Sequence, residues 1–186
     1  MEPKVVVQNV VASARLKHEI DLDTIVKAFP HVEYVPEIFP GLVFKLKRPK
    51  GCILIFKNGK MVCTGAKSRR EALRAVRKVV RELKKAGIII RSSRVEVEIH
   101  NVVATVELGE VSIDLIGTAY KLGRGAIYEP DQFPGLIYRM EDPKVTFLIF
   151  SSGKLVCVGS KNEEDIYRAV DKLQKLLEEN ELIFTS

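Results

Sequence analysis

Two asparagines and a set of basic residues recur at matching places in this sequence, and their chemistry is that of binding. Asn9 lies in VQNVVAS and Asn101 in IHNVVAT, so each amide sits in the same apolar pattern. An amide side chain donates hydrogen bonds, and a lysine or arginine neutralises phosphate. The basic residues of the strands and turns in the two regions are Lys45, Lys50, Lys60, Arg139, Lys144 and Lys154. Together these residues predict a surface that holds a polyanion and adds a few directed hydrogen bonds.

Catalytic and metal-binding patterns are missing from the sequence. His18, His31 and His100 have no cysteine or aspartate at ligand spacing, and the three cysteines form no CxxC pair. Gly59 and Lys60 lack the rest of a phosphate loop and are better explained as a hairpin turn. We therefore expect no enzyme activity, no catalytic residue, no cofactor, no metal and no small-molecule substrate.

An internal duplication organises the chain. Tyr34–Val76 aligns with Tyr128–Val170 at a constant shift of 94 residues, and 20 of the 43 positions are identical. Both copies contain Phe-Pro-Gly-Leu, LIF and Gly-Lys, and upstream the two asparagine motifs align at a shift of 92. Self-similarity of this kind predicts repeated structural units. We expect two similar lobes, residues 1–93 and 94–186, related by an approximate twofold axis.

Each copy predicts the same order of elements. A β-branched run is followed by a short helix, three strands joined by turns, and a long helix with one apolar face. The ranges are Val5–Ala14, Asp21–Phe29, Met61–Gly65 and Ser68–Lys85 in the first copy, and Val95–Val106, Ser112–Lys121 and Leu155–Gly159 in the second. This order predicts an α+β fold in which two tandem pseudo-symmetric repeats build an antiparallel sheet with the helices on one face.

One apolar face of the predicted sheet has no helix to cover it. Strand neighbours point to opposite faces, so one face of the first copy carries Asn9, Val11, Leu54, Phe56, Val62 and Thr64. Both faces are largely apolar, but two helices per copy cover only one of them. The alternatives are a sheet sandwich, a dimer of the units, or an interaction surface. The asparagines and the basic border favour an interaction surface, and the minor groove of a nucleic acid fits an apolar interior with a cationic rim.

Charge is divided between the halves. The net charge is +6, but residues 1–93 carry 20 Lys/Arg and 8 Asp/Glu, whereas residues 94–186 carry 10 and 16. The basic half predicts a polyanionic partner, and the acidic half a second contact of different character. No apolar run approaches the roughly 20 residues that span a bilayer, and the amino terminus lacks the layout of a signal peptide. We expect a location inside the cell and no membrane contact.

The repeated pattern VQNVVA, FPGL, LIF and GK.VC.G.K resembles the TATA-binding protein family of general transcription initiation factors. The resemblance covers essentially the whole chain. It implies a curved antiparallel sheet, shaped like a saddle, with the helices on the convex face. It also implies minor-groove binding of A·T-rich TATA promoter DNA and a kink of about 80°, which are properties of that family.

The resemblance assigns a DNA-contacting role to particular residues. Phe39 with Phe56, and Phe133 with Phe150, correspond to the family's two wedges, each pair 17 residues apart. The corresponding base and sugar contacts are Asn9, Asn101, Val11, Val103, Leu54, Leu148, Val62, Val156, Thr64 and Val158. Asparagine donors suit an A·T pair, which presents only acceptors in the minor groove. Val158 departs from the family's hydroxyl, so the second half-site is expected to be read mostly by shape.

The resemblance also implies protein partners. In the family, the loop before the second wedge contacts transcription factor B, and the assembly recruits RNA polymerase. Glu129 and Asp131 match the acidic positions of that loop, whereas Gln132 replaces the usual leucine. The absence of a long amino-terminal extension resembles archaeal members. This implies a cytoplasmic, nucleoid-associated location, or a nuclear one if the protein is eukaryotic.

Other interpretations of the same residues remain open. Sheet aromatics that stack on bases would suit single-stranded nucleic acid or RNA. Related sheet domains also occur in DNA-repair and nuclease proteins, and a homodimer through the apolar face needs no nucleic acid. The basic helix Lys67–Lys85 holds nine Lys/Arg. It predicts a contact with flanking DNA or with an acidic regulator.

Overall fold

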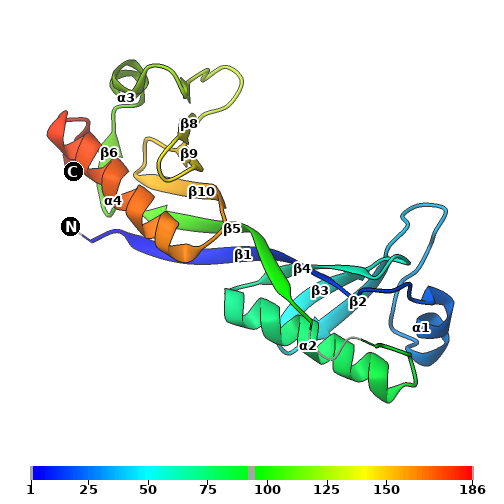
Figure 1. Cartoon of the computed structure of the whole chain (residues 1–186). Helices are drawn as coiled ribbons and strands as arrows, with labels where there is room; N and C mark the ends of the chain where they lie inside the picture. Colours follow the sequence, from blue (N-terminus) through cyan, green and yellow to red (C-terminus); the bar gives the residue numbers. More distant parts are fainter. Residues whose placement is uncertain (1, 92–94, 186) are drawn as a thin grey trace. The chain divides into compact units, whose positions relative to one another are not determined.

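The computed structural model describes residues 2–91 and 95–185. Within these ranges each half has the predicted order of a strand, a short helix, three strands and a long helix, and the second half has three further short strands (Figure 1). They are β1 (Lys4–Arg15), α1 (Leu22–Ala28), β2 (Leu42–Lys47), β3 (Lys50–Ile55), β4 (Lys60–Ala66), α2 (Arg69–Lys85), β5 (Val97–Glu107), β6 (Val111–Ile113), α3 (Leu115–Leu122), β7 (Ala126–Ile127), β8 (Leu136–Met140), β9 (Val145–Ile149), β10 (Lys154–Ser160), α4 (Glu163–Glu179) and β11 (Ile183–Thr185).

The chain divides into two compact units. The amino-terminal unit comprises residues 9–100, and the carboxyl-terminal unit comprises residues 1–8 with 101–186. Strand ends are exchanged between the two sequence halves, because Gln8 of β1 donates a 3.0 Å hydrogen bond to Thr105 within the carboxyl-terminal unit. The boundary that the sequence predicts between residues 93 and 94 lies outside the described residues and stays a prediction.

The amino-terminal unit is an antiparallel sheet with strand order β2-β3-β4-β1. Helix α2 packs along β3 and β4, as Figure 1 shows. The helix begins where Ser68 Oγ accepts the amide of Glu71 over 3.1 Å, and its apolar residues Val76, Val79 and Leu83 share one buried face. Helix α1 is capped by Asp21, the residue before its first turn, whose carboxylate accepts amides of that turn.

The carboxyl-terminal unit repeats this arrangement with strand order β5-β10-β9-β8-β7. Helix α4 packs on β10 and β9 and is capped by Asn162, whose Oδ1 accepts the amide of Asp165 over 2.7 Å. The helix predicted from Ser112 instead begins at Leu115. The reason is that β6 pairs with β11, so Ser112 is held in a two-stranded ribbon opposite Phe184.

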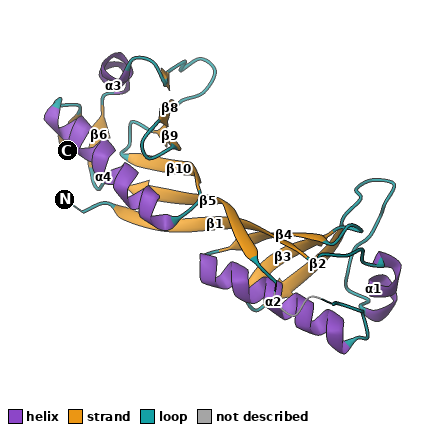
Figure 2. Cartoon of the chain, in the orientation of Figure 1, coloured by secondary structure: helices purple, strands orange, loops and turns teal. Residues whose placement is uncertain are grey.

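In each unit the helices lie on one side of the strands (Figure 2). The core is the layer between them, where side chains such as Phe44, Ile53, Phe147 and Ile149 are fully buried. The α+β class and the helix-covered antiparallel sheet are therefore as predicted. The other side of each sheet is not covered by the helices of its unit.

Candidate nucleic-acid interface

The side chains predicted to share an uncovered face do so. In the amino-terminal unit, Asn9, Val11, Leu54, Phe56, Val62 and Thr64 are half-buried. Their chain neighbours Val10, Ala12, Ile53, Ile55, Met61 and Cys63 are at most 1% exposed. The carboxyl-terminal unit repeats the alternation with half-buried Asn101, Val103, Leu148, Phe150, Val156 and Val158. We call these two half-buried surfaces, one in each unit, the open faces.

Each asparagine of the open faces is fixed by a β-bulge. Asn9 Oδ1 accepts the amide of Gly65 over 2.7 Å, and Asn101 Oδ1 accepts that of Gly159 over 2.8 Å. Both glycines have positive φ angles, 85° and 87°, and the strand register shifts by one residue at both places. Because the oxygen is committed to the bulge, the amide nitrogen is oriented away from it. The donor role that the sequence predicts for both amides stays a prediction, and the bulge explains how their nitrogens are oriented.

Two phenylalanine pairs lie at equivalent places, one in each unit. The rings of Phe39 and Phe56 are edge to face with centroids 5.8 Å apart, and those of Phe133 and Phe150 repeat the distance. Phe39 is 41% exposed, so this pair is not part of the core.

The repeated Phe-Pro-Gly-Leu motif builds this arrangement. A Cβ added at Gly41 would lie 2.6 Å from Phe39 Cε2, and one at Gly135 would lie 2.7 Å from Phe133 Cε2. The rings therefore rest on glycine backbone at a distance that no other residue permits. The leucine that follows, Leu42 or Leu136, is completely buried and anchors the segment to the core. Each motif holds aromatic rings on the surface of an otherwise packed unit.

Basic side chains lie along the strands and turns that bound the open faces. Lys45 Nζ is 3.5 Å from Glu33 Oε1, and both side chains are 66% exposed. An exposed pair of this kind contributes about 0–1 kcal/mol and leaves the cation available to a stronger anion. Lys60 is half-buried, and the remaining predicted residues, Lys50, Arg139, Lys144 and Lys154, are exposed.

Arg15 is a basic residue of this border that was not predicted from the sequence. Arg15 lies directly opposite Lys60 at the edge of the amino-terminal open face. In the carboxyl-terminal unit the corresponding pair is Glu107 with Lys154. The alternation of side chains along β1 could have identified Arg15, because Arg15 has the same parity as Asn9. The amino-terminal border is therefore the more cationic of the two.

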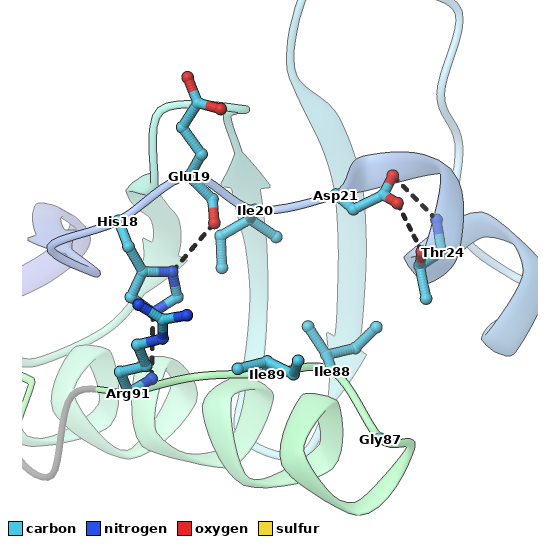
Figure 3. A pocket seen from close by; sticks show the side chains of 9 residues that line it. All are labelled: His18, Glu19, Ile20, Asp21, Thr24, Gly87, Ile88, Ile89 and Arg91. Atoms are coloured by element: carbon cyan, nitrogen blue, oxygen red, sulfur yellow. Dashed lines mark hydrogen bonds between the residues drawn. The ribbon is translucent and has the colours of Figure 1, made fainter.

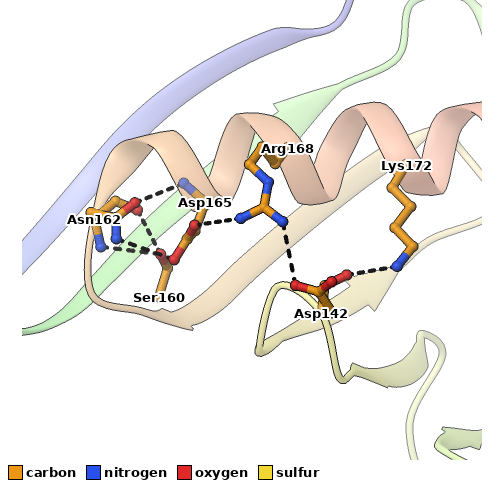
Figure 4. Close-up of polar contacts among 6 residues, drawn as sticks. All are labelled: Asp142, Ser160, Asn162, Asp165, Arg168 and Lys172. Carbon is orange, nitrogen blue, oxygen red and sulfur yellow. Dashed lines mark hydrogen bonds and ion pairs between the residues drawn. The ribbon is translucent and has the colours of Figure 1, made fainter.

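The turns that end the hairpins are held by the long helices. Lys78 Nζ on α2 donates to Arg48 O over 2.6 Å, and Lys172 Nζ on α4 donates to the equivalent Asp142 O over 2.7 Å. Arg168 adds ion pairs to Asp142 and Asp165, as Figure 4 shows. The contacts of Lys172 and Arg168 with Asp142 hold the β8–β9 turn, which lies between Arg139 and Lys144.

The loop before the second phenylalanine pair is exposed. Glu129, Asp131 and Gln132 are all on the surface, and Glu129 O accepts the amides of Gln132 and Phe133 over 2.9 and 3.0 Å. This turn orders the chain directly before Phe133. Its side chains point toward solvent rather than into the core.

The remaining polar clusters have structural explanations. A pocket of about 420 Å³ includes His18, whose Nδ1 donates to Glu19 O and whose Nε2 accepts the amide of Arg91 (Figure 3). In the same pocket, hydrogen bonds from the Thr24 hydroxyl and amide hold the pKa of Asp21 below its ordinary value. Both groups are thus engaged in organising the chain around α1.

The buried cysteines have no features of nucleophiles. Burial raises the pKa of Cys63 to about 11 and that of Cys157 to about 12, so both remain neutral thiols near pH 7. Among residues 2–91 and 95–185, no group of three His, Cys, Asp or Glu side chains is arranged to hold a metal. In the same ranges, no helix has the length and apolarity to cross a membrane.

Comparisons with known proteins agree on one family. The family model described as transcription factor TFIID, or TATA-binding protein, matches residues 4–86 and 96–180. The TATA-box-binding protein of Pyrodictium occultum is 50% identical over 176 residues, covering 95% of this chain and 87% of that protein. The Methanocaldococcus jannaschii protein of the same name is 47% identical and covers 96% of both chains. A solved structure, Methanococcus jannaschii TBP, covers 95% of this chain and 99% of its own with a TM-score of 0.84, which confirms the predicted fold.

Proposed function

The chain belongs to the TATA-binding protein family, and on that premise we propose that it is a general transcription initiation factor that binds A·T-rich TATA promoter DNA. The observation that carries this proposal is the pair of open faces, each half-buried and apolar, with a phenylalanine pair outside the core and with cations along its border. The protein binds DNA and is not an enzyme. The proposed activity requires only contact with the duplex and its deformation.

The phenylalanine pairs serve as wedges. Unstacking one base step costs a few kcal/mol. Phe39 exposes about two-fifths of its surface, so covering its ring removes about 80 Å² from water, and this contributes about 2 kcal/mol. Phe56, Phe133 and Phe150 are half-buried and contribute less than Phe39, so the two rings of a unit offset part of the cost of one unstacked step. The glycine beside each pair leaves room for both rings to lie close together, and we propose that they enter one base step together.

The asparagines and apolar side chains select A·T pairs. Adenine N3 and thymine O2 both accept hydrogen bonds in the minor groove, whereas guanine places an amino group there. Asn9 and Asn101 keep their oxygens on Gly65 and Gly159, so each presents its N–H donors to the groove. The valine and leucine contacts predicted beside them, Val11, Val103, Leu54, Leu148, Val62 and Val156, exclude water and leave no partner for a guanine amino group.

Phosphates bind along the cationic border. We assign this contact to Lys45, Lys50, Lys60, Arg139, Lys144 and Lys154, and we add Arg15 because it lies opposite Lys60. Neutralising phosphates releases counterions, so the affinity falls as salt rises.

The exposed loop of Glu129, Asp131 and Gln132 recruits transcription factor B, and through it RNA polymerase. Supporting this assignment are the loop's exposure and its place directly before Phe133. Because Gln132 has an amide where a leucine is usual, the contact is more polar than in other members. We also propose that the protein acts in the cytoplasm, on the nucleoid, and its similarity to archaeal TATA-box-binding proteins supports this location.

The test is a duplex with a central TATA run beside a G·C-scrambled control, with affinity and bend angle recorded for both. We expect preferential binding and bending of the TATA duplex. Equal affinity for both duplexes would refute the proposal. Equal affinity for the corresponding single strand would favour a single-strand binding protein instead.

A further inference from the structure

One row of residues across the open face differs between the two units. In the amino-terminal unit, Lys45 lies opposite Cys52, and Cys52 opposite Thr64. In the carboxyl-terminal unit the corresponding row is Arg139, Thr146 and Val158. Each row therefore contains one hydroxyl, but on different strands.

The displacement has a defined direction within the carboxyl-terminal unit. Strand β10 lies next to β5, and β9 lies beyond it. Thr146 on β9 is thus one strand further from β5 than Val158 on β10. Neighbouring strands are about 4.8 Å apart, and residues directly opposite each other have Cβ atoms about 4.5–5.5 Å apart. Compared with Thr64 in the amino-terminal unit, the hydroxyl of Thr146 therefore lies in the equivalent row but one strand further along it.

Thr146 is placed to contact a ligand rather than the core. Like Thr64, it is half-buried on the open face, whereas its neighbours Val145 and Phe147 are buried. No hydrogen bond recorded among the described residues uses the Oγ1 of Thr146 or Thr64. A valine has the same branched shape and strand preference, so the fold alone gives no reason for a hydroxyl at this position.

We propose that Thr146 supplies the polar minor-groove readout of the carboxyl-terminal unit, in place of the hydroxyl that Val158 lacks. The inference rests on the proposed function, since it needs a duplex on the open face. The Oγ1–H donates to adenine N3 or thymine O2, while Val158 beside it makes an apolar contact. Base pairs rise by about 3.4 Å, so a shift of one strand moves this contact by about one base pair away from β5.

The experiment combines protein variants with altered duplexes. Each base pair of the half-site bound by the carboxyl-terminal unit carries, in turn, a nucleotide lacking adenine N3 or thymine O2. Wild-type binding should weaken at the base pairs that Asn101 contacts and, about 2- to 12-fold, at one further base pair, which is the effect of a single neutral hydrogen bond. Thr146→Val should bind the unaltered TATA duplex more weakly by the same factor and lose the sensitivity at that base pair.

Two further variants sharpen the result. The double variant Thr146→Val with Val158→Thr should restore a sensitive base pair. This base pair should now lie one step nearer to β5. Thr185→Val, which removes an exposed hydroxyl on β11, is the matched control and should behave as wild type.

Three outcomes overturn the inference. One is a Thr146→Val variant that keeps the wild-type sensitivity. Another is an equal loss of affinity on every sequence together with a smaller salt slope, which indicates phosphate contact. If the wild type fails to prefer TATA over the scrambled duplex, the proposed function fails and the inference fails with it. If that preference holds while Thr146→Val changes nothing, only the inference fails.

Discussion

The rings of Phe133 and Phe150 lie edge to face, with centroids 5.8 Å apart and planes inclined by 66°. Both rings rest on Gly135, where an added Cβ would come within 2.7 Å of Phe133 and 3.0 Å of Phe150. Seventeen residues of sequence separate the two rings, and one glycine sets their spacing. The same relationship recurs with Phe39, Phe56 and Gly41.

Gly135→Ala should reduce the DNA bend while leaving the protein folded. The methyl group displaces two half-exposed rings, which yield more readily than backbone, so the stability cost should be about 1 kcal/mol or less. Gly51→Ala is the control, because its Cβ would meet nothing closer than 3.5 Å. Energy transfer between labelled DNA ends measures the bend. An unchanged angle in Gly135→Ala would show that ring spacing does not set it.

Asn101→Asp should separate the two roles of this asparagine. A carboxylate oxygen still accepts the Gly159 amide, so the bulge and the thermal stability should be retained. The N–H donors are lost and a negative charge faces the groove acceptors, so affinity for TATA DNA should fall by at least 10-fold, equivalent to about 1.4 kcal/mol. Titration calorimetry and thermal melting give both quantities. Retained affinity would exclude Asn101 as a donor to the bases.

The sequence predicted the open face well because strand alternation and the duplication can both be read directly from the order of the residues. Leu54 and Leu148, for example, could be assigned to the open face because alternate residues of a strand share a face and because the two copies align at a shift of 94 residues. It could not predict the bulges, since Gly65 and Asn9 are 56 residues apart and meet only through strand register. The ribbon of β6 with β11 was missed for the same reason, because Ile113 and Ile183 are brought together only by tertiary pairing. The Thr146–Val158 pair likewise requires knowing which residues stand opposite each other.

Arg139→Gln should lower the salt dependence of binding. Each phosphate neutralised contributes about −0.9 to the slope of log K against log salt, so losing one contact should make the slope shallower by about 1. Lys175→Gln is the control, because Lys175 lies on α4 and pairs with Asp171 at 3.0 Å. Binding isotherms between 50 and 200 mM salt, in the range where counterion release is measured, give the slopes. Equal slopes for Arg139→Gln and wild type would remove Arg139 from the phosphate border.

Glu129→Lys with Asp131→Lys should leave DNA binding intact and impair assembly with transcription factor B. Both side chains are exposed, and neither takes part in a recorded ion pair among the described residues, so the fold does not depend on them. Charge reversal in the loop should weaken the ternary complex, seen as a reduced mobility shift of the DNA-bound protein when the partner is added. Glu178→Lys with Glu179→Lys, two exposed positions on α4, serves as the control for charge alone. A ternary complex as strong as that of wild type would place the contact elsewhere.

Phe150→Ala should reduce bending more than it reduces nonspecific retention on DNA. Removing this ring leaves Phe133 without its edge-to-face partner, and the remaining ring no longer fills an opened base step. Phosphate contacts do not involve the ring, so weak binding to any duplex should persist. Phe184→Ala is the matched control, since Phe184 is 52% exposed on β11 and lies in the ribbon with β6 rather than on the open face. The bend angle and the affinity for a G·C-scrambled duplex are measured on all three proteins. If Phe150→Ala bends TATA DNA as wild type does, the ring is not a wedge, and the exposure of the pair needs another explanation.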